Sequence, residues 1–194
     1  MNSESLNQQV WVAVTRLTAL FKGDPNGEEA VKNALAQLLR LVDPSKPYGT
    51  VLFDSLSRLT WSIAFEGVAL RLNPKTKKPE VFLRKRADDD TAYPGEWHAP
   101  GSAFRPREKP NLVARRLSRE FGSEIMDFKL VGQYFSNEQR GDFLSLIYLV
   151  KFDGEPRVDN RHIWCPVDKL PENTVNIHRD HLIPAAVAAY RSSH

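Results

Sequence analysis

Apolar residues in the first part of the chain recur with the period of an α-helix. Within residues 5–21, one helical face carries four apolar residues at spacings of four, three and four: Val10, Val14, Leu17 and Phe21. The segment KGDPNG at residues 22–27 interrupts this pattern, and a second amphipathic stretch follows over residues 28–42. The pattern therefore predicts a helical hairpin within an N-terminal extension of residues 1–60.

From about residue 61 the chain changes to short runs rich in β-branched and aromatic residues. Residues 68–72 and 81–86 predict two strands joined by the basic loop NPKTKKP. Further strands are predicted over residues 130–135, 143–152 and 163–167, and helices over residues 111–121 and from about residue 180. This order of strands and helices predicts a second domain, residues 61–194, with an α+β fold built as an α/β/α sandwich.

The helix predicted over residues 111–121 lies in one of two basic segments. Pro110 suits its first turn and Gly122 the position after its last turn. Residues 101–120 hold six basic residues against two acidic ones, and residues 71–86 hold seven against one. Because the whole chain carries a net charge of only +3, these segments indicate an anionic partner, unless they simply solvate loops.

Composition and hydropathy narrow the class of protein. The chain has a single cysteine, Cys165, so it cannot form an intramolecular disulfide. No stretch approaches the roughly 18 apolar residues of a membrane span, and residues 1–10 lack the basic and apolar regions of a secretory signal. These features predict a cytoplasmic protein without a membrane partner.

One stretch resembles the signature of a known family. Residues 95–102, GEWHAPGS, resemble the G-x-W-x-x-P-G-G segment that precedes the box of the Nudix superfamily. With the first box glycine set on Gly101, the box spacing holds without a gap, and its arginine, last glutamate and second glycine fall on Arg115, Glu120 and Gly122. The resemblance implies a Nudix-type α/β/α sandwich with a mixed sheet, preceded here by the N-terminal helical hairpin.

The acidic residues of that box are mostly replaced by arginines. The other family glutamates fall on Arg107, Arg116 and Arg119, which leaves Glu120 as the matching carboxylate. Nudix enzymes cleave diphosphates, usually with Mg²⁺, which prefers carboxylate oxygens. Positions 116, 119 and 120 share one helix face, so two guanidinium groups there would repel the metal. We therefore expect no cofactor, and expect Mg²⁺ on Glu120 only if the protein is active.

The same arginine-rich segment suits an anionic ligand, because guanidinium groups bind phosphate oxygens through paired hydrogen bonds. The candidate ligand-binding residues are Arg105, Arg107, Arg115, Arg116 and Arg119, together with Trp97 and His98 of the preceding loop. Two structural alternatives stay open. Arg116 and Glu120 could form a surface ion pair, or Arg115 could support the loop before the helix.

Acidic residues outside the box offer a different route to catalysis. Glu138 and Asp142 lie before a long predicted strand, a region from which some Nudix enzymes take a catalytic base. With Glu120 they are the candidate catalytic residues of an active hydrolase. A base alone leaves the charge of the departing phosphate unneutralised, although arginines could supply part of that stabilisation.

Three functional hypotheses follow from the sequence. The first is a non-hydrolysing Nudix-like protein whose arginine-rich box binds a phosphate-bearing ligand, either a nucleotide or RNA. The second is an active Nudix hydrolase that cleaves a nucleoside diphosphate-linked substrate with acids in unusual positions. The third is a structural subunit whose N-terminal helices form a homodimer or bind another protein.

Overall fold

The computed structural model describes residues 8, 9, 11–16, 18, 27–44, 46–138 and 140–192. The chain divides into two compact units, Met1–Lys46 and Pro47–His194. In the first unit, α2 (Gly27–Leu39) confirms the helix predicted from residue 28, and the acidic Glu28 and Glu29 suit its N-terminal dipole. Residues 11–16 are also helical. Three members of the predicted apolar face, Val10, Leu17 and Phe21, lie outside the described residues.

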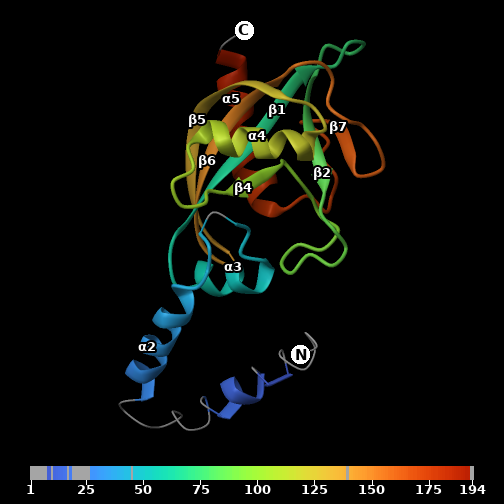
Figure 1. Cartoon of the computed structure of the whole chain (residues 1–194). Coiled ribbons are helices and arrows are strands. Elements are labelled where there is room, and N and C mark those ends of the chain that lie inside the picture. The colour runs from blue at the N-terminus through green and yellow to red at the C-terminus, as the bar shows by residue number, and fades with distance from the viewer. Residues whose placement is uncertain are drawn as a thin grey trace. The chain divides into compact units, whose positions relative to one another are not determined.

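A mixed seven-stranded sheet forms the centre of the second unit (Figure 1). Its strands are β1 (Ser62–Leu72), β2 (Pro79–Lys85), β3 (Trp97–His98), β4 (Gly101–Ala103), β5 (Ile125–Glu138), β6 (Gly141–Phe152) and β7 (His162–Pro166). The order is β3-β2-β1-β6-β5, with β4 paired to β1 and β7 paired to β2. β1 runs parallel to β6 and antiparallel to β2 and β4, so it forms the middle of the sheet.

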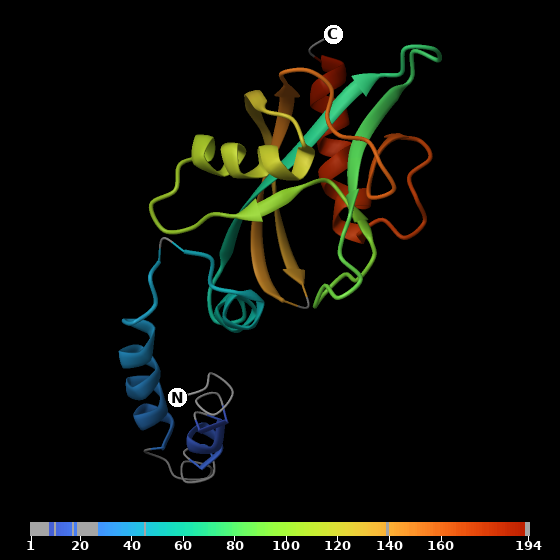
Figure 2. The same ribbon diagram turned by 45° about the vertical axis from the view of Figure 1, so that its right-hand side comes forward.

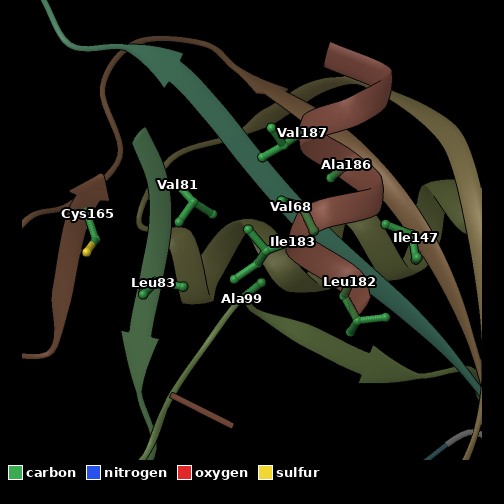
Figure 3. Close-up of a cluster of buried hydrophobic side chains, with 10 residues drawn as sticks. All are labelled: Val68, Val81, Leu83, Ala99, Ile147, Cys165, Leu182, Ile183, Ala186 and Val187. Atoms are coloured by element: carbon green, nitrogen blue, oxygen red, sulfur yellow. The ribbon is translucent and has the colours of Figure 1, made fainter. Parts of the chain in front are cut away.

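Helices cover both faces of this sheet, as the two ribbon views show (Figure 2). On one face α4 (Pro110–Phe121) buries Val113, Ala114, Leu117 and Phe121 against the sheet. On the other face, a π-helical turn η1 (His178–Leu182) leads into α5 (Ile183–Ser192). Figure 3 shows Leu182, Ile183 and Val187 packed against side chains of β1, β2 and β6. These two apolar cores confirm the predicted α/β/α sandwich.

Some predicted boundaries are wrong. The residues between the strands predicted over 130–135 and 143–152 are mostly strand as well, because β5 and β6 extend to Glu138 and Gly141. Asn137 and Asp142 face each other across this hairpin, and the Asn137 amide donates to the Asp142 carboxylate at 2.6 Å. Polar residues that pair with each other at the end of a hairpin lack the apolar alternation by which strands are predicted. The last helical segment begins at His178 rather than near residue 180.

The helix α3 (Thr50–Ser57) was not predicted. It belongs to the unit that holds the sheet, and its Phe53 ring lies 6.4 Å from that of Phe143 on β6. Its Asp54 carboxylate accepts a hydrogen bond from Arg140 in the β5–β6 turn at 2.8 Å. Eight residues are too few for a stable isolated helix in water, so tertiary contacts hold α3 in place.

The sheet divides at one end, and this division positions the site. β1 pairs with β2 only over Leu70–Leu72, and the two strands then diverge (Figure 2). Beyond the divergence β1 pairs with β4, and β2 pairs with β3.

Within the part of the chain that the structure describes, no helix has the length and apolar character needed to cross a membrane.

Candidate functional site

A cavity of about 410 Å³ lies at this divided end of the sheet, lined by residues of β1 and β4 and, beyond the end of β2, by Arg86 and by His98 of β3. Its polar lining residues include Glu66, Arg86, Tyr93, His98, Ser102, Arg105, Arg116, Glu138, Arg140, Ser145 and His178. Its aromatic lining residues are Tyr48, Phe53, Tyr93, Phe104 and Phe143. These residues come from α3, α4, η1 and five strands, so the tertiary fold alone brings them together.

Glu66, on β1, extends its carboxyl group over Gly101 of β4. The two residues are directly opposite in the ladder, and a Cβ atom on residue 101 would come within 1.9 Å of the Glu66 Oε2 atom. Glycine at the first box position therefore makes room for an acid from the neighbouring strand. Burial raises the pKa of Glu66 to about 8, and the nearby Glu138 carboxylate adds to this shift while Arg86 opposes it. The Glu66 carboxyl is thus mostly uncharged at pH 7.

Two buried histidines line the same cavity. The rings of His98 and His178 meet edge to face, with centroids 5.6 Å apart, and the residues are only 5% and 8% exposed. Burial lowers the pKa of His178 to about 3, and it lowers the pKa of His98 well below its usual value. Both imidazoles are therefore neutral at pH 7. The Nδ1 atom of His178 is buried and has no hydrogen-bond partner in the described structure.

Four arginines line the cavity, and three of them are held by carboxylates. Arg86 binds Asp90 at 2.8 Å, and Arg140 binds Asp54 at 2.8 Å. Arg116 binds Glu108 at 2.7 Å and also donates to the Ser102 hydroxyl and the Ala103 carbonyl. In the described part of the chain the guanidinium of Arg105 has no ion-pair partner, although its backbone N–H donates to Glu108.

Unpaired buried nitrogens concentrate around this cavity. Among the described residues four buried side-chain nitrogens lack a partner, and three belong to cavity residues: Nε of Arg86, Nε of Arg116 and Nδ1 of His178. Buried polar groups in folded proteins are nearly always hydrogen-bonded, and an unpaired one costs about 1–3 kcal/mol. The residues that carry three of these nitrogens therefore line the cavity, while the nitrogens themselves lie behind its surface.

The arginines predicted to bind a ligand lie in two different environments. Arg105 and Arg116 line the cavity. Arg115 and Arg119 are exposed on α4 and do not line it, and Arg107 is exposed on the preceding loop with a φ of 67°. α4 turns its apolar face to the sheet, so residues 115 and 119 point away from it.

Both structural alternatives from the sequence are wrong. Arg116 does not pair with Glu120, because Arg84 on β2 takes that carboxylate at 2.5 Å. The residue that supports the loop before α4 is Arg116, through Glu108, and not Arg115. In the family box the first glutamate and the arginine are eight positions apart. The ion pair between Glu108 and Arg116 has the same spacing and lies one position further along the chain.

The residues around Glu120 do not fit a Mg²⁺ ion. Its carboxylate is bound by the Arg84 guanidinium, and Arg116 and Arg119 stand where the box would supply further oxygens. In residues 27–44, 46–138 and 140–192, and in the few described residues before them, no group of three acidic, histidine or cysteine side chains is placed to hold a metal. Mg²⁺ requires several oxygen ligands, and arginine offers none.

The remaining predicted residues are distributed as follows. His98 and Glu138 line the cavity, and the Glu138 carboxylate accepts hydrogen bonds from Tyr93 at 3.0 Å and Ser136 at 2.9 Å. Trp97 packs against the apolar core that includes α5 and is not a cavity residue. Asp142 is bonded to Asn137 and also lies outside the cavity lining.

Sequence reasoning missed several polar residues of the cavity, above all Glu66, Arg86 and Arg140. Glu66 carried a signal, because it is a single acid within the apolar run IAFEGVAL at residues 63–70. A charged residue at such a position is expensive to bury unless it has a role or a partner. Arg86 and Arg140 carried no comparable signal, since each lies in a polar segment.

The chain belongs to the NUDIX domain family, whose family model matches residues 67–186. A solved structure with a similar fold is a MutT NUDIX hydrolase from Burkholderia pseudomallei, with a TM-score of 0.53 and 22% identity over 64% of this chain and 97% of that one. The NUDIX domain of Shewanella oneidensis NrtR, solved with ADP ribose, has a TM-score of 0.55 and 16% identity over 80% and 97% of the two chains. A comparison with curated proteins found no match.

A third structure with this fold is NrtR from the same organism complexed with a 27mer DNA. Its TM-score is 0.52, with 14% identity over 68% of this chain and 63% of that one. At these identities the three structures establish a shared fold and nothing finer.

Proposed function

We propose that this protein binds a phosphate-bearing ligand in the cavity at the divided end of the sheet and does not cleave it efficiently. The observation that carries the proposal is the group of four arginines, Arg86, Arg105, Arg116 and Arg140, that line one cavity. Phosphate oxygens are acceptors that pair with guanidinium N–H groups. A bound phosphate would therefore accept hydrogen bonds from the accessible guanidinium N–H groups of these arginines.

Arg105 is the residue best placed to add charge to this interaction. The guanidinium groups of Arg86, Arg116 and Arg140 are each balanced by a carboxylate, whereas that of Arg105 has no such partner among the described residues. It also lines the cavity, where burial keeps Glu66 and the two histidines uncharged at pH 7. An unbalanced arginine at a cavity wall attracts anions more strongly than a paired one.

Binding can be tested by titrating the full chain with ADP-ribose and with inorganic pyrophosphate, without divalent metal, in a calorimeter. We expect Arg105→Ala to weaken both ligands about tenfold, in line with the loss of one charge-assisted hydrogen bond. Arg119→Ala is the matched control, because it removes the same group from the exposed face of α4. If neither ligand binds, or if the two variants lose affinity equally, the proposal is wrong.

Inefficient hydrolysis is proposed for a separate reason. Metal-assisted cleavage requires oxygen ligands on the box helix, and Glu120 is neutralised there by Arg84. We expect no release of AMP from ADP-ribose with Mg²⁺ above the metal-free control.

The hydrolase hypothesis has one observation in its favour, which is that Glu66 and Glu138 lie in the cavity and influence each other electrostatically. Turnover that depends on Mg²⁺ and is lost in Glu138→Gln would establish this second function. Loss in Glu120→Gln as well would show that the ion pair with Arg84 opens during the reaction.

The hypothesis of a structural subunit rests on α2. Val31, Leu35 and Leu38 are spaced at four and three residues on one face of that helix, and all three are exposed within the described chain. An apolar face of this kind is typical of a helix that associates with another protein or another copy. Sedimentation of the full chain and of a variant with Leu35→Glu and Leu38→Glu tests self-association; a monomer in both cases leaves only a different protein as partner.

A further inference from the structure

We infer that α3 is a lid over the cavity and that Asp54 is the latch that keeps this lid closed. The inference concerns access to the cavity rather than what the cavity binds, so it goes beyond the proposed function and can be tested without a ligand. Figure 2 shows α3 at the end of the sheet where the β5–β6 turn and the loop between β2 and β3 also lie.

α3 and the residues just before it form one side of the cavity. This side is lined by Pro47, Tyr48, Gly49, Thr50 and Phe53. Ser145 of β6 also lines the cavity and is only 3% exposed. A side chain on the cavity wall is thus shielded from solvent while α3 is in place.

The apolar side chains of α3 anchor it only weakly. Leu52, Phe53 and Leu56 are half-buried, and Val51 is 83% exposed. None of these four residues belongs to either of the two apolar cores of the sandwich. Hydrophobic stabilisation is roughly proportional to the apolar area removed from water, so an eight-residue helix that buries so little can open without unfolding the sheet.

The polar contacts of α3 converge instead on Asp54. One of its carboxylate oxygens accepts a hydrogen bond from Nε of Arg140 at 2.8 Å, and the other accepts one from the Thr91 hydroxyl at 3.1 Å. The Arg140 guanidinium also lies over the Phe53 ring, 5.1 Å from its centroid. One carboxylate therefore joins α3 both to the β5–β6 turn and to the loop between β2 and β3.

The loop that receives this latch is itself held in place. Asp90 binds Arg86 at 2.8 Å and accepts hydrogen bonds from two backbone N–H groups of the loop. The Tyr93 hydroxyl donates to Glu138, at the end of β5, at 3.0 Å. Because these contacts do not involve α3, loss of the Asp54 contacts should release the helix and leave the loop unchanged.

The two ends of α3 differ in a way that indicates how it opens. At the C-terminal end Ser57 is buried, and its hydroxyl shares a hydrogen bond with that of Ser62 on β1 at 3.0 Å. Gly141 packs so closely there that a Cβ atom on it would come within 2.0 Å of the Ser57 carbonyl oxygen. Before the N-terminal end, Gly49 has a φ of 74°, a conformation that favours glycine. We therefore expect the N-terminal end of α3 to swing outward about its anchored C-terminal end.

The lid can be tested with a thiol placed behind it. Ser145→Cys exchanges one atom and puts a cysteine on the cavity wall. Cys165 of β7, which is buried in the apolar core beside α5 and does not line the cavity, serves as a reference in the same molecule. The full chain is treated with iodoacetamide, a small uncharged reagent, and the labelling of both thiols is followed by mass spectrometry of peptides. With the latch intact, we expect the thiol at position 145 to react at least about tenfold more slowly than in urea-unfolded chain.

Removal of the latch should speed this reaction. Asp54→Ala deletes both latch contacts, and we expect labelling at position 145 to become about fivefold faster while Cys165 is unaffected. Asp168→Ala is the matched control, because it removes a carboxylate from an exposed ion pair, with Lys78, that does not line the cavity. It should leave both rates unchanged.

A double variant shows whether Asp54 acts through Arg140. Arg140→Ala alone should also speed labelling at position 145. If the two residues form one latch, the variant with both Asp54→Ala and Arg140→Ala should label little faster than Asp54→Ala alone. Effects that multiply would mean that the two side chains act separately, and the latch assigned to this pair would be wrong.

Three further results would overturn the inference. The first is equal labelling at position 145 with and without Asp54. The second is a thiol that reacts as fast in the native protein as in the unfolded chain, since the cavity would then be open without movement of α3. The third is an equal rise at Cys165, which would mean that the whole domain unfolds. No ligand takes part in these measurements, so the calorimetric titrations decide the proposed function independently of the lid.

Discussion

The outer face of α4 and the cavity at the divided end of the sheet are both rich in arginine, but the arginines of the two regions differ in burial and in their ion-pair partners. Arg115 and Arg119 are solvated on the helix surface and have no partner in the described part of the chain. Arg86 and Arg116 are half-buried, each is held by a carboxylate, and each keeps one buried N–H unpaired. An ion pair between exposed groups contributes little to stability, whereas a half-buried pair holds its guanidinium in a fixed position beside the cavity.

The box helix also differs from its family pattern in how its charges are arranged. Arginines stand at three glutamate positions of the pattern, and two ion pairs are present, Glu108 with Arg116 and Arg84 with Glu120. The loop and helix keep their geometry because these pairs still connect them to each other and to the sheet. The same ion pairs engage the carboxylates of Glu108 and Glu120, which would otherwise be available as metal ligands.

The largest effect should come from reversing charge in the half-buried pair. Arg116→Glu places two carboxylates together beside Ser102 and leaves Glu108 uncompensated, so we expect the free energy of unfolding to fall by about 3 kcal/mol. Arg119→Glu makes the same chemical change on the exposed face and should alter it by less than about 0.5 kcal/mol. Urea unfolding at pH 7 measures both, and similar values would mean that the two regions do not differ as described.

A somewhat smaller effect is expected from filling the space beside Glu66. Gly101→Ala puts a Cβ where the Glu66 carboxyl lies, and the forced displacement should cost about 2 kcal/mol. Gly132→Ala on β5 is the control, since its Cβ would make only ordinary contact at 3.4 Å with Ile147. Thermal unfolding of both variants is the measurement, and an undisturbed Gly101→Ala protein would contradict the packing of Glu66 against β4.

Acidification should destabilise the cavity region through its histidines. The pKa of His178 is about 3 in the folded protein and about 6.5 in an unfolded chain, so the unfolded chain binds more protons below pH 6.5. The stability from the neutral imidazole is complete above pH 6.5 and is lost as the pH falls toward 3. Between pH 6.5 and 5.5 we expect a loss of about 1 kcal/mol from His178.

His178→Phe provides the comparison for this titration, because His98 and the other groups remain. The wild-type protein should lose about 1 kcal/mol more stability than this variant over the same interval. Equal losses in denaturant unfolding at the two pH values would show that His178 is not held neutral.

The smallest effect concerns α3. Asp54→Asn removes the charge that binds Arg140, and we expect about 1 kcal/mol or less of lost stability, confined to α3. Hydrogen exchange should become faster in residues 50–57 while the amides of β1 and β6 keep their protection. Faster exchange throughout the sheet would mean that α3 is part of the core rather than a separate cover of the cavity.

The sequence by itself determined the fold family and most of the elements. The glycines at 101 and 122, the helix between them and the apolar runs of β1, β2 and β6 are local signals, because helix ends and strand periodicity depend on neighbouring residues. Gly122 does adopt the left-handed conformation at the end of α4, with a φ of 65°. The spacing alone likewise predicts that arginines stand at positions where the family pattern has acids.

Only the tertiary structure decided which charges face each other. Arg84 and Glu120 are 36 positions apart, and no local sequence signal indicates that they form a pair. Glu66 likewise contacts Gly101 only because their two strands are neighbours in the sheet. α3 was not predicted from the sequence, because contacts with β6, rather than its own short sequence, stabilise the helix. The cavity exists because β1 and β2 diverge after three paired residues. Burial there sets the charge state of Glu66 and His178, and burial is a property of the packed chain that no single segment contains.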